Sequence, residues 1–185
     1  MYIPIIYTGS FPYGQASANR VLSYAVEMAN LGQEVQVISL VTYDQPFTDE
    51  ERADLMKHAA ITYKGVNVHY VSGRNFWPRE KGKKVKKVWL NLKGVLRATK
   101  LLKRRKGEYK SVIMYGSSVF QYFWLSRVVK RNNAKLVVER AELPSIEQKK
   151  SRYEKSFTGR LLIHLTKKAF NKPDAWILET QHLVD

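Results

Sequence analysis

Short apolar runs and helical periods alternate along the chain, and the alternation is clearest over the first 41 residues. An apolar run at residues 2–7 is followed by a loop of small residues and then by a helical pattern. That pattern places small and apolar side chains every three or four positions on one face: Ala18, Val21, Leu22, Ala25, Met28 and Ala29. Gly32 suits a helix end, and a second apolar run occupies residues 35–41. The segment therefore predicts a strand–helix–strand unit with parallel strands.

The same alternation continues to the end of the chain. Short apolar runs predict further strands at residues 66–71, 111–115, 136–139 and 175–178. Helical spacing predicts helices at residues 18–31, 84–105 and 117–131, with a further helical region that opens at Pro144 and continues through residues 161–170. Residues 42–65 form a polar excursion with only a weak helical signal. This order predicts an α/β fold, a Rossmann-like parallel sheet with helices on both faces, in a single domain of residues 1–185.

Composition narrows the class of protein only a little. The chain has no cysteine, which excludes disulfides, thiolate nucleophiles and cysteine metal sites. No apolar run approaches the ~18 residues of a membrane-spanning helix, and no basic leader precedes the first apolar run. We therefore expect a cytoplasmic protein. The chain ends just after its last predicted strand, and we expect a boundary between domains there.

The net charge of +16 is the compositional outlier, and much of it is concentrated in one segment. Residues 79–110 hold 14 basic residues and 2 acidic ones, and the helix predicted at residues 84–105 lies inside this segment. Three interpretations fit: a solvated surface helix, a helix that meets anionic lipid headgroups, or a face that neutralises nucleic-acid phosphates. We favour membrane contact over nucleic acid, since no base-reading motif accompanies the charges. The membrane-contact candidates are Lys83, Lys84, Lys86, Lys87, Trp89 and Lys93.

The loop between the first strand and the first helix is a candidate phosphate site. Small residues let backbone N–H groups approach an anion, and the start of a helix stabilises negative charge. The residues of this candidate are Gly14, Gln15, Ala16 and Ser17. The glycine patterns of dinucleotide-binding folds and of P-loops are both missing. A tight turn that binds nothing explains the loop equally well.

The strand predicted at residues 136–139 leads into polar residues at the edge where α/β folds bind their ligands. They are Glu139, Arg140 and Glu142. Carboxylates accept hydrogen bonds from sugar hydroxyls, and a guanidinium clamps a phosphate or holds a neighbouring carboxylate. These residues are therefore candidates for positioning an acceptor substrate. An internal ion pair that caps the next helix is the alternative.

The strand predicted at residues 111–115 also ends in candidate ligand contacts, which are Tyr115, Gly116 and Ser117. Helix capping by Ser117 or Ser118 is the more ordinary role for these hydroxyls. The four histidines are scattered along the chain, so we expect neither a metal site nor a catalytic histidine. The catalytic residues stay unassigned.

Several segments carry motifs in a recognisable order. A loop with Pro12, Gly14 and Ala16 precedes the first helix, and Gly32 separates that helix from the second strand. A glutamate-rich segment at residues 136–144 and a segment at residues 173–180 follow later. In order and spacing these segments resemble the N-terminal domain of family 4 glycosyltransferases. Where members often carry a histidine after the fourth strand, this chain has Tyr115-Gly116-Ser117.

The resemblance implies a GT-B architecture, in which two Rossmann-like domains face each other across a cleft. This chain would be the N-terminal, acceptor-side half, and the C-terminal donor-binding domain would be absent from it. Gly14 would lie near the donor phosphate. The nucleotide sugar would be a substrate, and such enzymes retain anomeric configuration and generally need no metal or other cofactor.

We therefore expect a retaining enzyme that transfers a sugar from a nucleotide sugar to a cell-envelope or lipid-linked glycan acceptor, as in polysaccharide biosynthesis. It would work in the cytoplasm, peripheral to the inner face of the cell membrane. The alternative is a non-catalytic Rossmann-like module that binds anionic lipid or nucleic acid through its basic helix.

Overall fold

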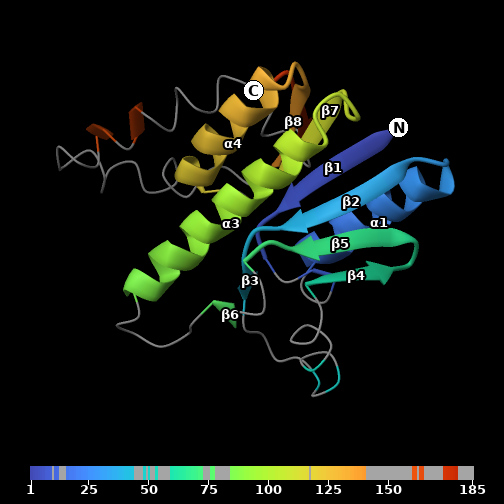
Figure 1. The fold of residues 1–185 in the computed structure, drawn as a ribbon, viewed down its shortest axis with the longest axis horizontal. Helices are drawn as coiled ribbons and strands as arrows, with labels where there is room; N and C mark the ends of the chain where they lie inside the picture. Colours follow the sequence, from blue (N-terminus) through green and yellow to red (C-terminus); the bar gives the residue numbers. More distant parts are fainter. Residues whose placement is uncertain are drawn as a thin grey trace.

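The computed structural model shows an α/β fold built on one large sheet (Figure 1). It describes residues 1–9, 11–12, 16–43, 48, 50, 53, 59–72, 76–77, 84–116, 118–140, 160–161, 163–164 and 173–178. The helices are α1 (Ala16–Asn30), α3 (Lys84–Arg104) and α4 (Val119–Arg131). The strands are β1 (Tyr2–Tyr7), β2 (Glu34–Ser39), β3 (Thr42–Tyr43), β4 (Ala60–Tyr63), β5 (Val66–Tyr70), β6 (Phe76–Trp77), β7 (Ser111–Tyr115), β8 (Lys135–Arg140) and β9 (Ala175–Leu178).

The large sheet has seven strands in the order β4-β5-β2-β1-β7-β8-β9. β1 lies at its centre and pairs in parallel with β2 on one side and with β7 on the other. The order reverses at β1, because the chain first builds outward to β5 and then returns to build β7, β8 and β9. All neighbouring pairs are parallel except β4 with β5. The predicted α/β class with a mostly parallel, Rossmann-like sheet is confirmed.

β4 is the clearest departure from the expected elements, because the sequence pattern assigned residues 60–63 to a polar excursion. β4 and β5 form an antiparallel hairpin, and Thr62 donates a hydrogen bond across it to Asn67 at 3.1 Å. The turn residues Lys64 and Gly65 both have positive φ, 49° and 78°. Two positive φ values in a two-residue turn match the twist of the flanking strands. The short parallel pair of β3 with β6 was likewise unexpected.

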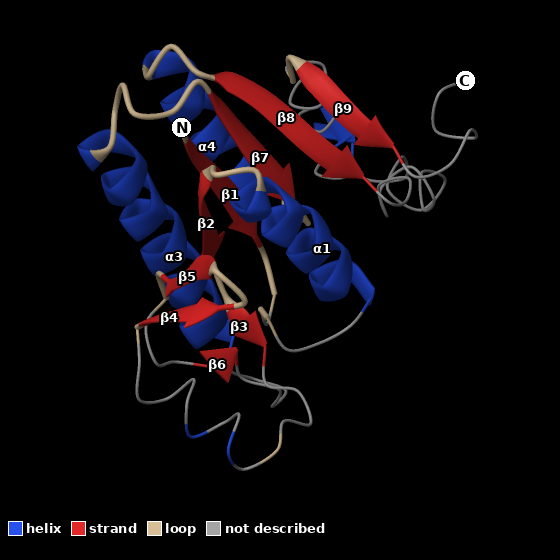
Figure 2. Ribbon diagram, turned by 90° about the vertical axis from the view of Figure 1, so that its right-hand side faces the viewer, coloured by secondary structure: helices blue, strands red, loops and turns tan. Residues whose placement is uncertain are grey.

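The helices cover opposite faces of the sheet, as expected (Figure 2). α1 packs through Ala18, Val21 and Ala25 on the face that receives Ile3 and Ile5 of β1. α3 and α4 pack on the other face, where the alternate residues of β1 contribute to a second hydrophobic core. Because β1 is buried on both faces, its continuous apolar run is explained.

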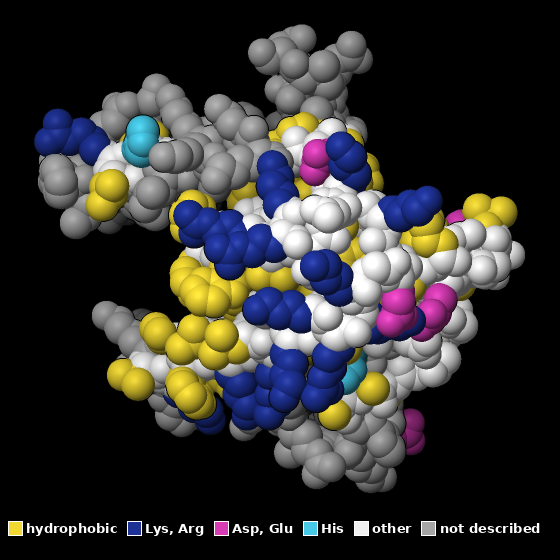
Figure 3. Space-filling view, turned by 45° about the horizontal axis from the view of Figure 1, so that its top comes forward, with side chains coloured by type: hydrophobic (Ala, Val, Ile, Leu, Met, Phe, Trp, Pro, Cys, Tyr) yellow, Lys and Arg dark blue, Asp and Glu magenta, His cyan; other side chains and the backbone are white. Residues whose placement is uncertain are grey.

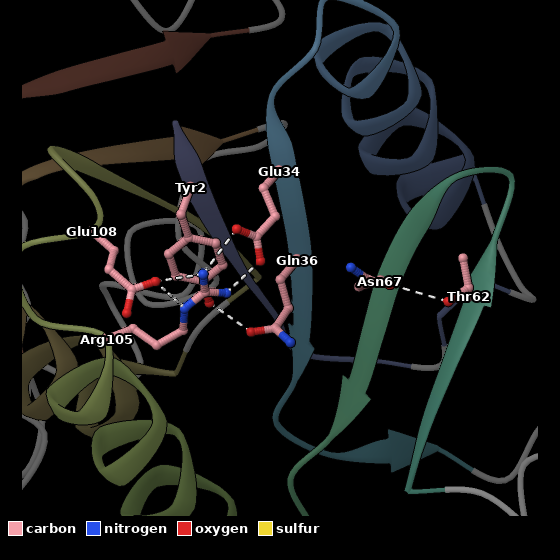
Figure 4. Close-up of polar contacts among 7 residues, drawn as sticks. All are labelled: Tyr2, Glu34, Gln36, Thr62, Asn67, Arg105 and Glu108. Atoms are coloured by element: carbon pink, nitrogen blue, oxygen red, sulfur yellow. Dashed lines mark hydrogen bonds and ion pairs between the residues drawn. The ribbon is translucent and has the colours of Figure 1, made fainter.

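The C-terminal end of α3 is tied to the amino edge of the sheet, where β1 and β2 begin (Figure 4). The guanidinium of Arg105, just after α3, donates to both carboxylate oxygens of Glu34 at 2.6 and 2.9 Å. It also donates to Glu108 and lies 3.6 Å from the centre of the Tyr2 ring. The hydrogen bonds from Arg105 lower the pKa of Glu34. This network fixes one end of α3 against β1 and β2.

Candidate site at the carboxyl edge of the sheet

The ends of β1, β7 and the start of α1 meet at the carboxyl edge of the sheet. The hydroxyl of Tyr7 lies 3.0 Å from the Ser17 hydroxyl in the first turn of α1. The Tyr7 ring stacks on the Tyr115 ring, with centroids 5.5 Å apart and planes 20° apart. The backbone N–H of Thr8 donates to the Tyr115 carbonyl at 3.4 Å. Two predicted regions, Ser17 and Tyr115, are therefore brought together through β1.

The loop that leaves β1 is fixed by the neighbouring strands β2 and β5. The Ser39 hydroxyl donates to the Gly9 carbonyl at 2.9 Å, and the Tyr70 hydroxyl donates to the Phe11 carbonyl at 2.6 Å. The Phe11 side chain is fully buried, and the Phe11–Pro12 peptide is cis. Gly9 and Phe11 are thus anchored to β2 and β5.

Glu139 of β8 lies at the same edge and turns toward α1. One carboxylate oxygen accepts a hydrogen bond from the Tyr24 hydroxyl at 2.6 Å, and the other lies 3.5 Å from a guanidinium nitrogen of Arg20. Glu139 is only 3% exposed. A buried carboxylate needs such partners, because leaving it uncompensated is costly. Glu139 therefore links β8 to α1 across the edge of the sheet.

The start of α4 completes the edge. Gly116 has a φ of +65°, a conformation that favours glycine, and it connects β7 to the helix. Ser118 caps α4 in a reciprocal capping box with Gln121, so Ser118 takes the capping role that was expected of it or of Ser117. The Gln121 side chain accepts from the Thr8 hydroxyl at 3.3 Å and donates to Asn91 of α3 at 2.6 Å.

The structure places the expected site residues unevenly. Ala16 and Ser17 open α1, which begins two residues earlier than the pattern indicated. Arg140 is the last residue of β8. Outside the described residues lie Gly14, Gln15, Ser117, Glu142 and Lys83, together with the side chains of Arg140 and Lys84. Their predicted roles stay predictions.

Sequence reasoning missed Tyr24 and Arg20, the two partners of Glu139. Both residues lie on α1, four positions apart, so they share one face of the helix. They flank the apolar stripe that the helical period identified, and this adjacency was the available signal. The identity of their partner was not available, because it lies more than 100 residues further along the chain.

The buried hydroxyl of Tyr24 makes the stability of this cluster depend on pH in the alkaline range. Burial first, and then the hydrogen bond to Glu139, raise the pKa of Tyr24. Such a tyrosine contributes stability below its unfolded pKa of about 10, and the contribution is lost as the pH rises further. We expect the free energy of unfolding to fall above about pH 10, and to fall less steeply in Tyr24→Phe. Urea titrations across this pH range measure both slopes. Tyr2, whose pKa burial raises to about 12, retains part of the slope in both proteins. Equal slopes would contradict the role given to Tyr24.

The basic helix is the second candidate surface. Along α3 the side chain of Lys86 is exposed, those of Lys87 and Lys93 are half-buried, and Trp89 is exposed.

Among the described helices, none is both long and apolar enough to cross a membrane. In the same part of the chain, no three side chains of His, Asp and Glu cluster as they would around a metal ion.

Comparison with known proteins assigns no function to either of these two surfaces. The chain matches no known protein family and no curated protein, so the resemblance to glycosyltransferases stays a prediction from the sequence motifs.

Proposed function

We propose that this chain is the N-terminal half of a retaining glycosyltransferase. The enzyme would transfer a sugar from a nucleotide sugar to a cell-envelope or lipid-linked glycan acceptor. One observation carries the proposal: the ends of β1, β7 and β8 and the start of α1 meet at the carboxyl edge of the sheet, beside the strand where its order reverses. In α/β sheets, ligands bind at this edge and at this reversal.

The solvent exposure of the site residues indicates which of them could contact a ligand. Ser17 and Tyr115 are half-buried and Gly116 is exposed, so these three can touch a ligand. Glu139 is buried against Tyr24, so it would act by positioning α1 and not by direct contact with an acceptor. The start of α1 would stabilise charge on the donor diphosphate through its backbone N–H groups and its dipole, together with Gly14 and Gln15. The nucleotide itself would be held by a second domain.

The acceptor class has a consequence for location. An enzyme that glycosylates a cell-envelope or lipid-linked acceptor from a cytoplasmic nucleotide sugar would work as a peripheral protein on the inner face of the membrane. No metal or other cofactor enters this proposal.

The test is donor binding by the natural, full-length protein. We expect at least one UDP-, GDP- or ADP-sugar to raise its melting temperature, since a ligand that binds only the folded state stabilises it. Ser17→Ala should weaken this donor's binding by roughly tenfold if the Ser17 hydroxyl donates to a phosphate. Ser23→Ala is the matched control, because Ser23 is exposed on the same helix and its hydroxyl donates to the Asn19 carbonyl at 2.9 Å. If no nucleotide sugar protects the protein, the enzyme proposal fails.

The alternative is a non-catalytic module that binds anionic lipid or nucleic acid. The observation in its favour is that α3 and α4 together contain many basic residues and no acidic one. Binding of vesicles or nucleic acid without any protection by nucleotide sugars would favour it.

A further inference from the structure

α3 presents two different apolar faces, only one of which packs on the sheet. The buried face carries Leu90, Val95, Ala98 and Leu102. The helical period over residues 84–105 predicts one apolar stripe that includes residues 85, 88, 89 and 96, and the structure buries only part of it. Val85 is 84% exposed and Trp89 60% exposed, and Val88 and Leu96 are also exposed. These four residues recur at intervals of three, one and seven positions, so they lie along one side of the helix.

α4 extends this apolar side. Its exposed face carries Phe120 and Trp124, whose ring centroids are 6.2 Å apart. The Trp124 indole N–H donates to the Thr99 hydroxyl of α3 at 3.2 Å, so the two helices present one continuous surface. We call it the α3–α4 surface, and its apolar residues are Val85, Val88, Trp89, Leu96, Phe120 and Trp124.

Basic side chains border the α3–α4 surface. α3 alone contains eight basic residues and no acidic one. Lys86, Lys93, Arg97, Lys100 and Arg104 follow one another at intervals of seven, four, three and four positions, which aligns them along the helix next to the apolar side. Figure 3 shows hydrophobic side chains gathered beside a band of Lys and Arg side chains. On α4, the Arg127 guanidinium lies 3.5 Å from the centre of the Phe123 ring.

The apolar part of this surface lies near the candidate site. Gln121, in the first turn of α4, contacts Thr8 just after β1 and also contacts Asn91 of α3. The first halves of both helices are thus attached to the carboxyl edge of the sheet, whereas Arg105 ties the end of α3 to the amino edge. Figure 1 shows α3 running from one edge to the other with its first turns projecting beyond the strands.

We propose that the α3–α4 surface docks this protein on a bilayer that contains anionic lipid. α3 lies parallel to the membrane plane, with Val85, Trp89 and Trp124 at the level of the headgroups and the basic residues on phosphates. Because the apolar residues in the first turns of α3 and α4 lie near the carboxyl edge, docking through them brings that edge close to the bilayer. The docking rests on α3 and α4 themselves, and only its use, presenting a lipid-linked acceptor, rests on the proposed function.

Charge and shape select this occupant. An in-plane helix with aromatic and aliphatic residues on one side and Lys or Arg beside them is the pattern of interfacial membrane binding. Tryptophan favours the interface, because its ring is apolar and its N–H is polar. Nucleic acid would use the charges but would gain nothing from Val85 and Val88, and a neutral protein partner would gain nothing from the charges.

The experiment sediments the natural, full-length protein with vesicles of phosphatidylcholine, alone or mixed with phosphatidylglycerol. We expect binding to the mixed vesicles only. Lys93→Gln with Lys100→Gln should weaken it roughly thirtyfold, at about fivefold for each basic residue near the surface. Val85→Ser with Trp89→Ser should weaken it roughly tenfold or more, through lost apolar burial.

Two control variants match these changes elsewhere. Lys110→Gln with Lys135→Gln removes two exposed charges at the starts of β7 and β8, and Leu31→Ser removes an exposed apolar residue after α1. Both should bind vesicles within about threefold of wild type, since screening limits the reach of distant charges. If each variant melts at the same temperature as the wild type, misfolding is excluded as the cause of any loss of vesicle binding.

Three results would overturn docking on a bilayer. The first is equal binding by all variants. The second is an absence of vesicle binding with duplex or single-stranded nucleic acid bound instead. The third is an absence of vesicle binding together with a dimer that Val85→Ser with Trp89→Ser dissociates. Thermal protection by nucleotide sugars is measured on the same proteins. If no nucleotide sugar raises the melting temperature of the wild type or of any variant, that result counts against the proposed function and not against docking.

Discussion

Gly94→Ala is expected to destabilise the protein by about 3 kcal/mol, which for a chain of this size lowers the melting temperature by roughly 10 °C. The reason is a close approach of α3 to the end of β2. A Cβ at position 94 would lie 2.3 Å from the carbonyl oxygen of Leu40 and 3.2 Å from its carbonyl carbon. Backbone cannot rotate away as a flexible side chain can, so the helix or the strand end must shift. The gain of about 1 kcal/mol in helix propensity offsets only part of this cost.

Chemical denaturation of Gly94→Ala beside Lys100→Ala measures this effect. Lys100 is exposed on the same helix, so its replacement should change the free energy of unfolding by less than about 0.5 kcal/mol. A Gly94→Ala protein as stable as the wild type would mean that α3 does not pack this closely on the sheet. Because α3 also presents the α3–α4 surface, a displaced helix should weaken vesicle binding in parallel.

The larger elements could be predicted because their periods are set by burial. The continuous apolar run at residues 2–7 follows from the central position of β1, and the spacing of Ala18, Val21 and Ala25 follows from the single face that α1 buries. β4 was missed because an edge strand is paired on only one side. Its four residues alternate only between exposed and half-buried, so they form no buried apolar run, and the Lys64-Gly65 turn was the clearest local signal.

The partners of the site residues could not be predicted, because they depend on how separate elements pack. Sequence placed Glu139 at a strand end but could not show that Tyr24 and Arg20 would meet it there. Likewise, the helical period of α3 could not tell Val95, which packs in the core, from Trp89, which nothing in the described structure buries. Periodicity identifies apolar faces, but the neighbouring elements decide which of them are covered.

Glu139→Ala is expected to cost about 3 kcal/mol, the second large effect. The substitution leaves the Tyr24 hydroxyl without its acceptor, leaves Arg20 without the opposite charge at β8, and opens a small cavity. Glu139→Gln keeps an oxygen for Tyr24 and fills the same space, so it should cost only about 1 kcal/mol. Urea denaturation at neutral pH measures both values.

A double-mutant cycle distinguishes the positioning role of Glu139 from direct contact with an acceptor. If Glu139 acts by holding α1, Tyr24→Phe and Glu139→Gln are coupled, and their combined cost falls short of the sum of the single costs by about 1 kcal/mol or more. Under the proposed function, Tyr24→Phe in the natural, full-length protein should then weaken donor binding in the same direction as Glu139→Gln, because both loosen the helix that carries Ser17. A contact with the acceptor predicts the opposite pattern: Glu139→Gln would lower turnover with donor binding intact, and Tyr24→Phe would leave both unchanged. That pattern, together with additive changes in the free energy of unfolding, would show that Glu139 contacts the acceptor directly and does not act by positioning α1.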